Sequence, residues 1–119
     1  MSSLRQDWDM SDPSYNLVRP ADATESNPEP GLVRRLGAGN ARISLAEHIM
    51  EAGWTGAAHS HPQDQMAYVV SGRLRVRVGD EEFEVARGDS FVVRGGVEHQ
   101  ATALEPSHVI DVFAPYRGY

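Results

Sequence analysis

The sequence predicts an all-β protein whose strands close into a barrel or pack as two sheets. Between residues 32 and 115, short runs with apolar residues are interrupted at close intervals by glycine, proline, asparagine or aspartate. This pattern is typical of antiparallel strands joined by short turns. No stretch has the 3.6-residue spacing of an amphipathic helix of useful length. About eight such strands in a small domain favour a closed or sandwiched architecture, which leaves few sheet edges exposed.

Composition and charge exclude several classes of protein. The 119 residues are enough for one domain with a single core. A net charge of -6, from 17 acidic and 11 basic residues, argues against binding to nucleic acid or to an anionic membrane surface. The absence of cysteine excludes disulfides and thiolate metal ligands. Since neither a secretory signal nor a membrane-spanning run is visible, we expect a cytoplasmic protein.

Residues 1–31 are predicted to form an N-terminal arm, and residues 32–119 the folded domain. Four of the seven prolines lie in the arm among small polar and acidic residues, which disfavours both a helix and a central strand. The apolar residues Trp8, Met10, Tyr15 and Leu17 are unusual in a disordered tail, although such a tail is the alternative. We therefore expect the arm to pack on its own domain or on a partner subunit.

The strands of the domain can be placed in order along the chain. They are expected at residues 32–36, 43–50, 65–71, 73–78, 81–85, 91–94, 99–104 and 108–113. In the fourth of these strands leucine and valine alternate with arginine, and in the fifth phenylalanine and valine alternate with glutamate. We interpret the arginines as cross-strand partners of the glutamates on a solvated face. A phosphate-binding arginine cluster is the alternative.

Four side chains have the chemistry and the spacing of metal ligands. His59, His61 and Gln65 have the same parity in an extended chain and can share one inner face, and His99 ends a second glycine-rich segment. Three imidazole nitrogens and one amide oxygen suit a first-row divalent metal such as Ni, Zn, Fe, Mn or Co. A single histidine is more often a surface or core residue, but the combined spacing of four ligands and several glycines favours a metal site.

These spacings resemble the two sequence motifs of the cupin superfamily, whose members are small jelly-roll barrels. The first motif has two glycines around a His-x-His pair, represented here by Gly53, His59, His61 and Gly72. Gln65 stands where most members carry glutamate. The second motif is represented by Gly88, Gly96 and His99. Arg94 and Ala103 replace its proline and asparagine. The resemblance covers about residues 32–115 and implies a cupin β-barrel preceded by the extended arm, without specifying an activity.

Within the superfamily, the chain resembles the pectin-degradation protein KdgF and its relatives. The resemblance lies in the segments HSHPQDQ, YVVSG and DVFAPYR. Members of this subgroup convert unsaturated monouronates, which polysaccharide lyases produce, into open-chain keto-uronates. The resemblance implies a metal-dependent enzyme of this kind, with Asp111, Phe113 and Arg117 as pocket residues needed for activity. Small cupins commonly pair through their sheets, so we also expect a homodimer.

Each of these pocket residues has a chemical role and a structural alternative. Asp111 would move a proton between oxygen and carbon, or would be the partner of an arginine or a backbone amide. Arg117 would clamp a substrate carboxylate, or would be a solvated charge near the end of the sequence. Phe113 would form a wall for the sugar ring, or would be a core aromatic. Because the four metal ligands are neutral, the ion would keep its full charge and act as a good Lewis acid.

Strand parity assigns faces to three further residues. His108 has the opposite parity to Asp111, so it is not expected to be a ligand. His48 lies near the pocket if alternate residues of its strand face inward. Tyr68 has the opposite parity to Gln65 and should lie outside.

Two other functions are compatible with the sequence. The first is a cupin dioxygenase, against which Gln65 argues modestly because a neutral ligand disfavours higher oxidation states of the metal. The second is a non-catalytic protein that binds a sugar or metabolite through the metal. In every case the partner is a small molecule, and in the KdgF-like case it is a carboxylate sugar.

Overall fold

The computed structural model describes residues 13–119 and is an all-β structure, as the sequence predicts. A short 3-10 turn, η1 (Pro20–Asp22), precedes the strands. The strands are β1 (Thr24–Glu29), β2 (Leu32–Asn40), β3 (Ile43–Met50), β4 (Asp64–Ser71), β5 (Arg73–Val78), β6 (Glu81–Ala86), β7 (Ser90–Val93), β8 (His99–Ala103) and β9 (Ser107–Ala114). In the part of the chain described, no helix is long and apolar enough to cross a membrane.

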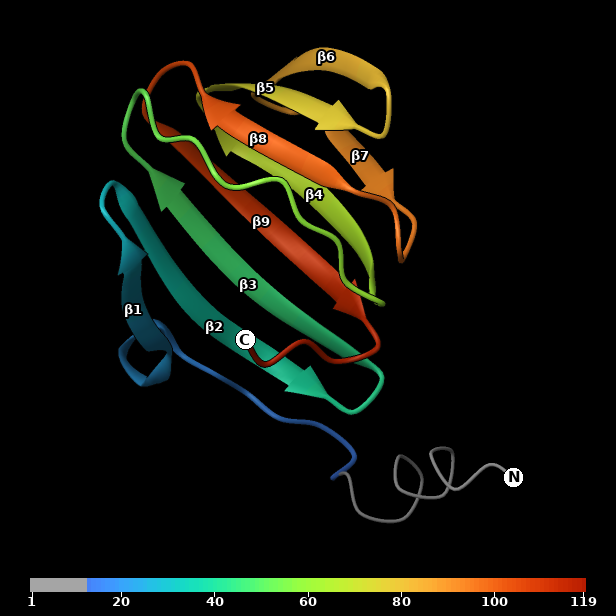
Figure 1. Ribbon diagram of the computed structural model, residues 1–119. Coiled ribbons are helices and arrows are strands. Elements are labelled where there is room, and N and C mark those ends of the chain that lie inside the picture. Colours follow the sequence, from blue (N-terminus) through green and yellow to red (C-terminus); the bar gives the residue numbers. More distant parts are fainter. Residues whose placement is uncertain (1–12) are drawn as a thin grey trace.

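The nine strands form two antiparallel sheets (Figure 1). The larger has the order β1-β2-β3-β9-β4-β7 and the smaller the order β6-β5-β8. The two sheets do not join into one continuous hydrogen-bonded barrel, so the architecture is the sandwiched form of a jelly roll. Pairs distant in the sequence, such as β3 with β9 and β5 with β8, build both sheets.

Strand β2 is longer than predicted because its glycines continue the strand. The strand predicted at residues 32–36 runs on to Asn40, with a register shift between Leu36 and Gly39. A Cβ at Gly37 would lie 2.9 Å from Leu45 Cδ2, and a Cβ at Gly39 would lie 2.9 Å from Ser44 Cβ. The glycines therefore permit the close approach of β3. The turn follows at residues 41–42.

The segment between β3 and β4 lies along the smaller sheet and carries the first cupin motif. The backbone of residues 53–59 pairs with β8, with isolated bridges from Thr55 to Thr102 and from His59 to His99. In Figure 1 this loop crosses in front of β9 and β4 before it enters β4. The pairing brings the two motifs together, because His59 lies on one side of the bridge and His99 on the other.

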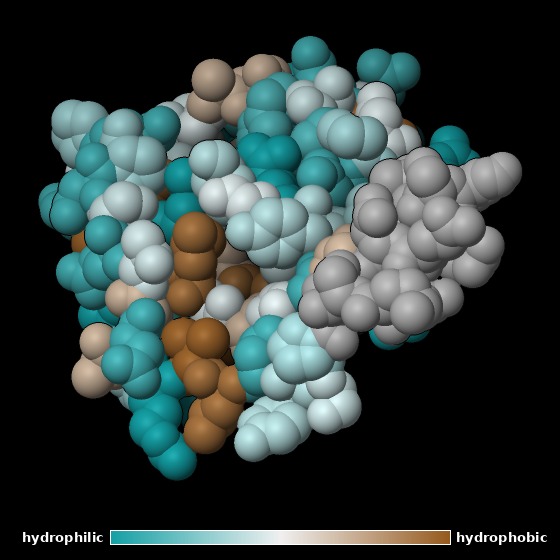
Figure 2. Space-filling view, turned by 90° about the horizontal axis from the view of Figure 1, so that it is seen from below, coloured by the Kyte–Doolittle hydropathy of each residue, from teal (hydrophilic) through white to brown (hydrophobic). Residues whose placement is uncertain are grey.

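The core lies between the inner faces of the two sheets. Its buried cluster consists of Leu32, Met50, Ala67, Val69, Leu74, Val76, Val85, Ala103 and Val109. On the outer face of the smaller sheet, Arg73 forms a cross-strand ion pair at 2.9 Å with its diagonal neighbour Glu84, its register partner being Ala86. Arg77 pairs instead with Glu98, outside the predicted glutamate strand. Seen from below (Figure 2), a band of apolar surface is bordered by hydrophilic residues.

Part of the predicted arm is an exposed edge strand. All six residues of β1 are exposed, and β1 pairs with β2 through contacts such as Glu25 opposite Arg35. Tyr15 and Leu17 are also largely exposed. Trp8 and Met10 lie outside the described residues.

Candidate metal-binding site and pocket

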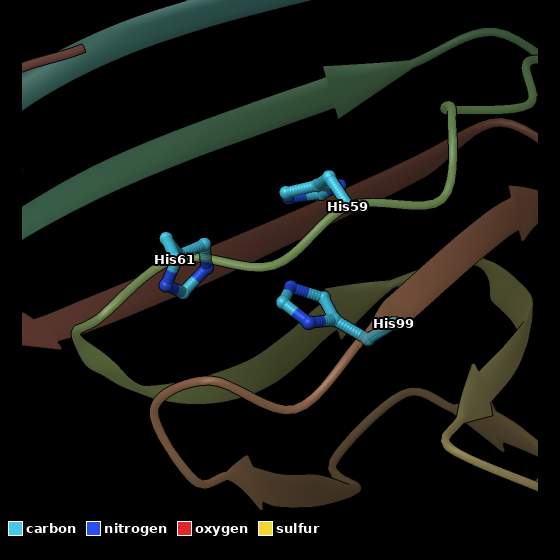
Figure 3. A group of neighbouring side chains, drawn as sticks. All are labelled: His59, His61 and His99. Atoms are coloured by element: carbon cyan, nitrogen blue, oxygen red, sulfur yellow. The ribbon is translucent and has the colours of Figure 1, made fainter.

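Three histidines converge at the mouth between the two sheets (Figure 3). His59 and His61 come from the loop before β4, and His99 is the first residue of β8. One ring nitrogen from each residue lies within 4.8 Å of the others. Two backbone hydrogen bonds between His59 and His99, of 3.1 and 2.9 Å, hold the loop against the strand. The sequence-predicted histidine ligands are therefore brought together by pairing between remote segments.

Each histidine turns the same ring nitrogen away from the site. Nδ1 contacts a backbone carbonyl oxygen two residues away in all three cases, at Ala57 for His59, Gln63 for His61 and Val97 for His99. A carbonyl only accepts hydrogen bonds, so Nδ1 carries the proton and Nε2 is left as a lone pair facing the site. Nε2 of His99 is buried without a hydrogen-bond partner. A buried lone pair of this kind fits a metal ligand.

Burial keeps two of these imidazoles in the form that binds metal. Burial lowers the pKa of His61, and the positive charge of Arg117 adds to this shift, whereas the Gln65 oxygen, which can accept a bond from the protonated ring only, opposes it. Burial also lowers the pKa of His99, with a smaller opposing effect from its bond to the Val97 carbonyl. Since neutral imidazole is the metal-binding form, both shifts favour metal binding over protonation at neutral pH.

Gln65 presents its amide oxygen to the same point. Its Nε2 donates to Oδ1 of Asp111 at 2.8 Å, and a carboxylate can only accept, so Oε1 must face the other way. Oε1 lies 3.0 Å from Nε2 of His61. With the His61 proton on Nδ1, two lone pairs face each other there, which a shared cation would relieve.

Asp111 is part of a hydrogen-bonded chain that crosses the larger sheet. Its Oδ2 lies 2.7 Å from Nδ1 of His48, and Nε of Arg34 donates to Nε2 of His48 at 3.0 Å. Because the Arg34 Nε–H only donates, His48 Nε2 must accept and Nδ1 must donate to Asp111. Asp111 is only 5 % exposed, and each of its carboxylate oxygens accepts a hydrogen bond, one from His48 and the other from Gln65. Such a carboxylate is held firmly in one orientation.

A single cavity of about 260 Å³ contains these groups and opens to solvent. Phe113, which is 2 % exposed, forms part of its wall, and its ring centroid lies 5.6 Å from that of His61. Arg117 reaches the cavity from the segment after β9, where its backbone nitrogen donates to Ser44 Oγ at 3.0 Å. The ring of Tyr119 closes this side, 5.8 Å from Phe113 between centroids.

The structure places every sequence-predicted site residue on this cavity. They are His59, His61, Gln65, His99, Asp111, Phe113 and Arg117. His48 lines it as well, whereas His108 lies on the outer face and contacts Glu47 at 2.8 Å. Tyr68 is 49 % exposed, on the outer face.

Sequence reasoning missed Arg34 and Tyr119. Arg34 has the parity of buried Leu32 in β2, so an arginine on an inward face was the available signal. Tyr119 follows the last strand, and no local pattern distinguishes it.

The chain is similar to known proteins along most of its length. The cupin domain family matches residues 46–113. An uncharacterized protein from Streptomyces coelicolor is 38% identical over 74 residues, which cover 61% of this chain and 70% of that protein. The structure of KdgF from Halomonas sp. has a TM-score of 0.80 and 32% identity, covering 87% of this chain and 96% of that one.

A second solved structure supports the same assignment. An RmlC-like cupin from Shewanella frigidimarina has a TM-score of 0.81 and 28% identity, covering 88% of this chain and 95% of that one. The family match spans β3 to β9, the strands that carry or flank the three histidines. The chain belongs to the cupin superfamily and resembles KdgF.

Proposed function

We propose that this protein is a metal-dependent enzyme that opens the ring of an unsaturated monouronate, or of a similar small oxygenated acid, to give its keto form. The observation that carries the proposal is the contact between Gln65 and Asp111. It joins a carboxylate to a neutral candidate ligand in the cavity that Arg117 also lines, and this supports acid–base chemistry beside a metal. The resemblance to KdgF supports the substrate class.

His59, His61, Gln65 and His99 would hold a divalent ion, namely Ni, Zn, Fe, Mn or Co. All four are neutral, so the ion would keep its charge and polarise a substrate oxygen as a Lewis acid. The lone pair at His99 Nε2 and the facing acceptors of His61 and Gln65 are what fit such an ion. The cavity volume suits a ligand of monosaccharide size.

The reaction is an isomerisation and needs no second reactant. The hemiacetal carbon–oxygen bond of the ring breaks, its hydroxyl becomes an aldehyde, and the former ring oxygen becomes an enol. The enol becomes a ketone when the neighbouring carbon gains a proton. We assign to Asp111 the removal of the hydroxyl proton and its return to carbon. Arg117 would hold the carboxylate and Phe113 would face the ring.

The experiment is a turnover assay with each candidate metal. Loss of the ultraviolet absorbance of the conjugated double bond measures the reaction, and the His59→Ala/His61→Ala variant is the control. Turnover by the intact protein and none by the variant is expected. If the unsaturated monouronate is not consumed with any of the five metals, the ring-opening assignment fails.

Two alternatives make different predictions in the same assay. A cupin dioxygenase would consume oxygen along with an organic substrate, and oxygen uptake would follow it. A sugar- or metabolite-binding protein would bind an acidic sugar through the metal and convert none. The neutral Gln65 oxygen at the site favours the isomerase over the dioxygenase.

We also propose that the protein acts as a homodimer in the cytoplasm. Met66 and Val92 lie opposite each other on the outer face of the larger sheet and are 56 % and 64 % exposed. Burying this face against a second copy would remove apolar surface from water. Light scattering should give twice the chain mass at micromolar concentration, and Val92→Glu should give the chain mass. An Ala52→Glu control, in an exposed turn, should remain dimeric; a monomeric intact chain contradicts the proposal.

A further inference from the structure

Two arginines in the cavity lack a carboxylate partner. On the outer faces, Arg35, Arg73 and Arg77 each have a glutamate oxygen within 3.4 Å. Arg34 and Arg117 line the cavity, and neither forms an ion pair with any residue of the range 13–119. A half-buried guanidinium without a counter-charge is costly unless a ligand supplies one.

Both guanidinium groups lie against the same aromatic ring, that of Tyr119. Cζ of Arg34 lies 3.7 Å from the ring centroid of Tyr119, and Cζ of Arg117 lies 4.5 Å from the same centroid. Nε of Arg117 is buried with no hydrogen-bond partner. Burial lowers the pKa of Arg34, and the nearby charge of Arg117 adds to this effect. The ring therefore gathers two positive charges at one end of the cavity.

The carboxylates of Glu29 and Asp111, which also line the cavity, partly offset the lowering of the Arg34 pKa, but among the described residues neither forms an ion pair with either arginine. Both oxygens of Asp111 are engaged, one by His48 and the other by Gln65. Tyr119 keeps 45 % of its surface exposed, but the protein atoms packed around its phenol raise its pKa to about 12. The phenol is therefore neutral at pH 7 and cannot act as the anion.

We propose that Arg34 and Arg117 together form a carboxylate-binding site at the Tyr119 end of the cavity. This inference rests on the proposed function, because it takes the ligand to be a small acid. Guanidinium groups donate paired hydrogen bonds to a carboxylate, and buried Nε of Arg117 is one unused donor. Arg34 is thereby a specificity-determining residue that selects acids over neutral sugars.

The geometry of the cavity sets the orientation of the ligand. The Phe113 ring lies 5.6 Å from the His61 ring and 5.6 Å from Cζ of Arg117, so it borders both the histidine end and the arginine end of the cavity. A ligand whose carboxylate is at the arginines extends its other oxygens along Phe113 toward His59, His61 and His99. The acid group and the reacting oxygens thus occupy different ends.

The test measures binding rather than turnover. Isothermal titration calorimetry of the intact, metal-loaded protein would compare D-galacturonate with D-galactose, which lacks the carboxylate. The intact protein should prefer galacturonate. Arg34→Gln should weaken galacturonate binding ~10-fold to 100-fold and leave galactose binding unchanged, because one charge-assisted contact is lost. Arg34→Lys, which keeps the charge without the planar fork, should lose less.

Arg35→Gln is the matched control. It removes the same charge from the next residue of β2, but Arg35 faces outward and pairs with Glu25 at 2.8 Å. This variant should keep the full preference for galacturonate. Metal content and thermal melting, measured on each variant, would show whether Arg34→Gln keeps the fold and the ion.

The outcomes separate this inference from the ring-opening assignment. Unchanged galacturonate binding by Arg34→Gln, or an equal loss for both sugars, overturns the carboxylate site. Tighter binding of D-galactose 6-phosphate than of galacturonate overturns it in favour of a phosphate. If unsaturated monouronate is not converted but the galacturonate preference depends on Arg34, the ring-opening function fails and the carboxylate site stands.

Discussion

Gln65 donates a hydrogen bond of 2.8 Å from its amide nitrogen to Oδ1 of Asp111. This contact determines which end of the amide faces the histidines, because a carboxylate accepts only from the nitrogen end. It also joins the candidate metal ligand to the candidate proton carrier. A change at either residue should therefore affect both metal affinity and turnover.

The first prediction concerns metal content. His59→Ala/His61→Ala removes two ligand nitrogens and should abolish stoichiometric metal in protein purified without added ions. His108→Ala removes an imidazole that contacts Glu47 on the outer face and should keep the metal. Elemental analysis by mass spectrometry measures both. Equal metal content in the double variant and the intact protein would place the ion elsewhere.

Asp111→Asn should lower turnover at saturating metal by a factor of ~10²–10⁴, the usual contribution of a general acid–base group. The asparagine amide has one accepting oxygen, whereas Gln65 and His48 both donate toward this position. The N–H of either Gln65 or His48 would then face the new NH₂ group and lose its acceptor. Because Gln65 is a candidate metal ligand oriented by this contact, metal affinity should also fall ~10-fold to 100-fold.

The control for this variant is Asp80→Asn, in the exposed turn between β5 and β6. It should keep both turnover and metal affinity. Near-full turnover of Asp111→Asn at saturating metal would show that Asp111 is a structural residue.

A third prediction concerns the pH dependence of stability in the metal-free protein. The folded-state pKa values of His61 and His99 lie below the ordinary value of 6.5. At pH values between the folded-state pKa and 6.5, the unfolded chain therefore binds more protons than the folded protein. The free energy of unfolding should therefore be highest above that window and decrease as pH falls below about 6.5.

Urea unfolding with a chelator present, at pH 5 and pH 7.5, would measure this difference. The His61→Gln/His99→Gln variant should show a smaller change between the two pH values than the intact protein. His108→Gln, altered on the outer face, should retain the intact protein's change. An unaltered difference in the double variant would mean that other groups cause the acid sensitivity.

Gly72 should be far less tolerant of alanine than Gly79. Both have positive φ, at 93° and 57°. A Cβ at Gly72 would meet Ser107 Oγ and lie 2.5 Å from the Pro106 carbonyl oxygen, whereas a Cβ at Gly79 would have no neighbour within 4 Å. We expect Gly72→Ala to lose about 3 kcal/mol of unfolding free energy and Gly79→Ala about 1 kcal/mol. Denaturant titration measures both losses. Equal losses would show that the positive φ, and not the contact with Ser107 and Pro106, causes the loss of stability at Gly72.

The sequence by itself determined the strand class and most of the inward-facing side chains. Alternation is a local property of an extended backbone, so it predicted that Asp111 and Phe113 share one face of their strand and that His108 lies on the other. Glycine spacing and the His-x-His pair likewise located the first segment of candidate metal ligands. These features depend only on residues that are close together in the chain, so the sequence is sufficient to predict them.

Only the tertiary structure decided how these segments meet. The bridge between His59 and His99 joins residues from different motifs, and the contact of His48 with Asp111 spans 63 positions. Such pairings depend on which remote segments lie side by side, and the alternation within one segment does not say which segment will be its neighbour. For the same reason the length of β2, the use of Arg34 and the position of Tyr119 could not be predicted. Each depends on what a remote strand places opposite it.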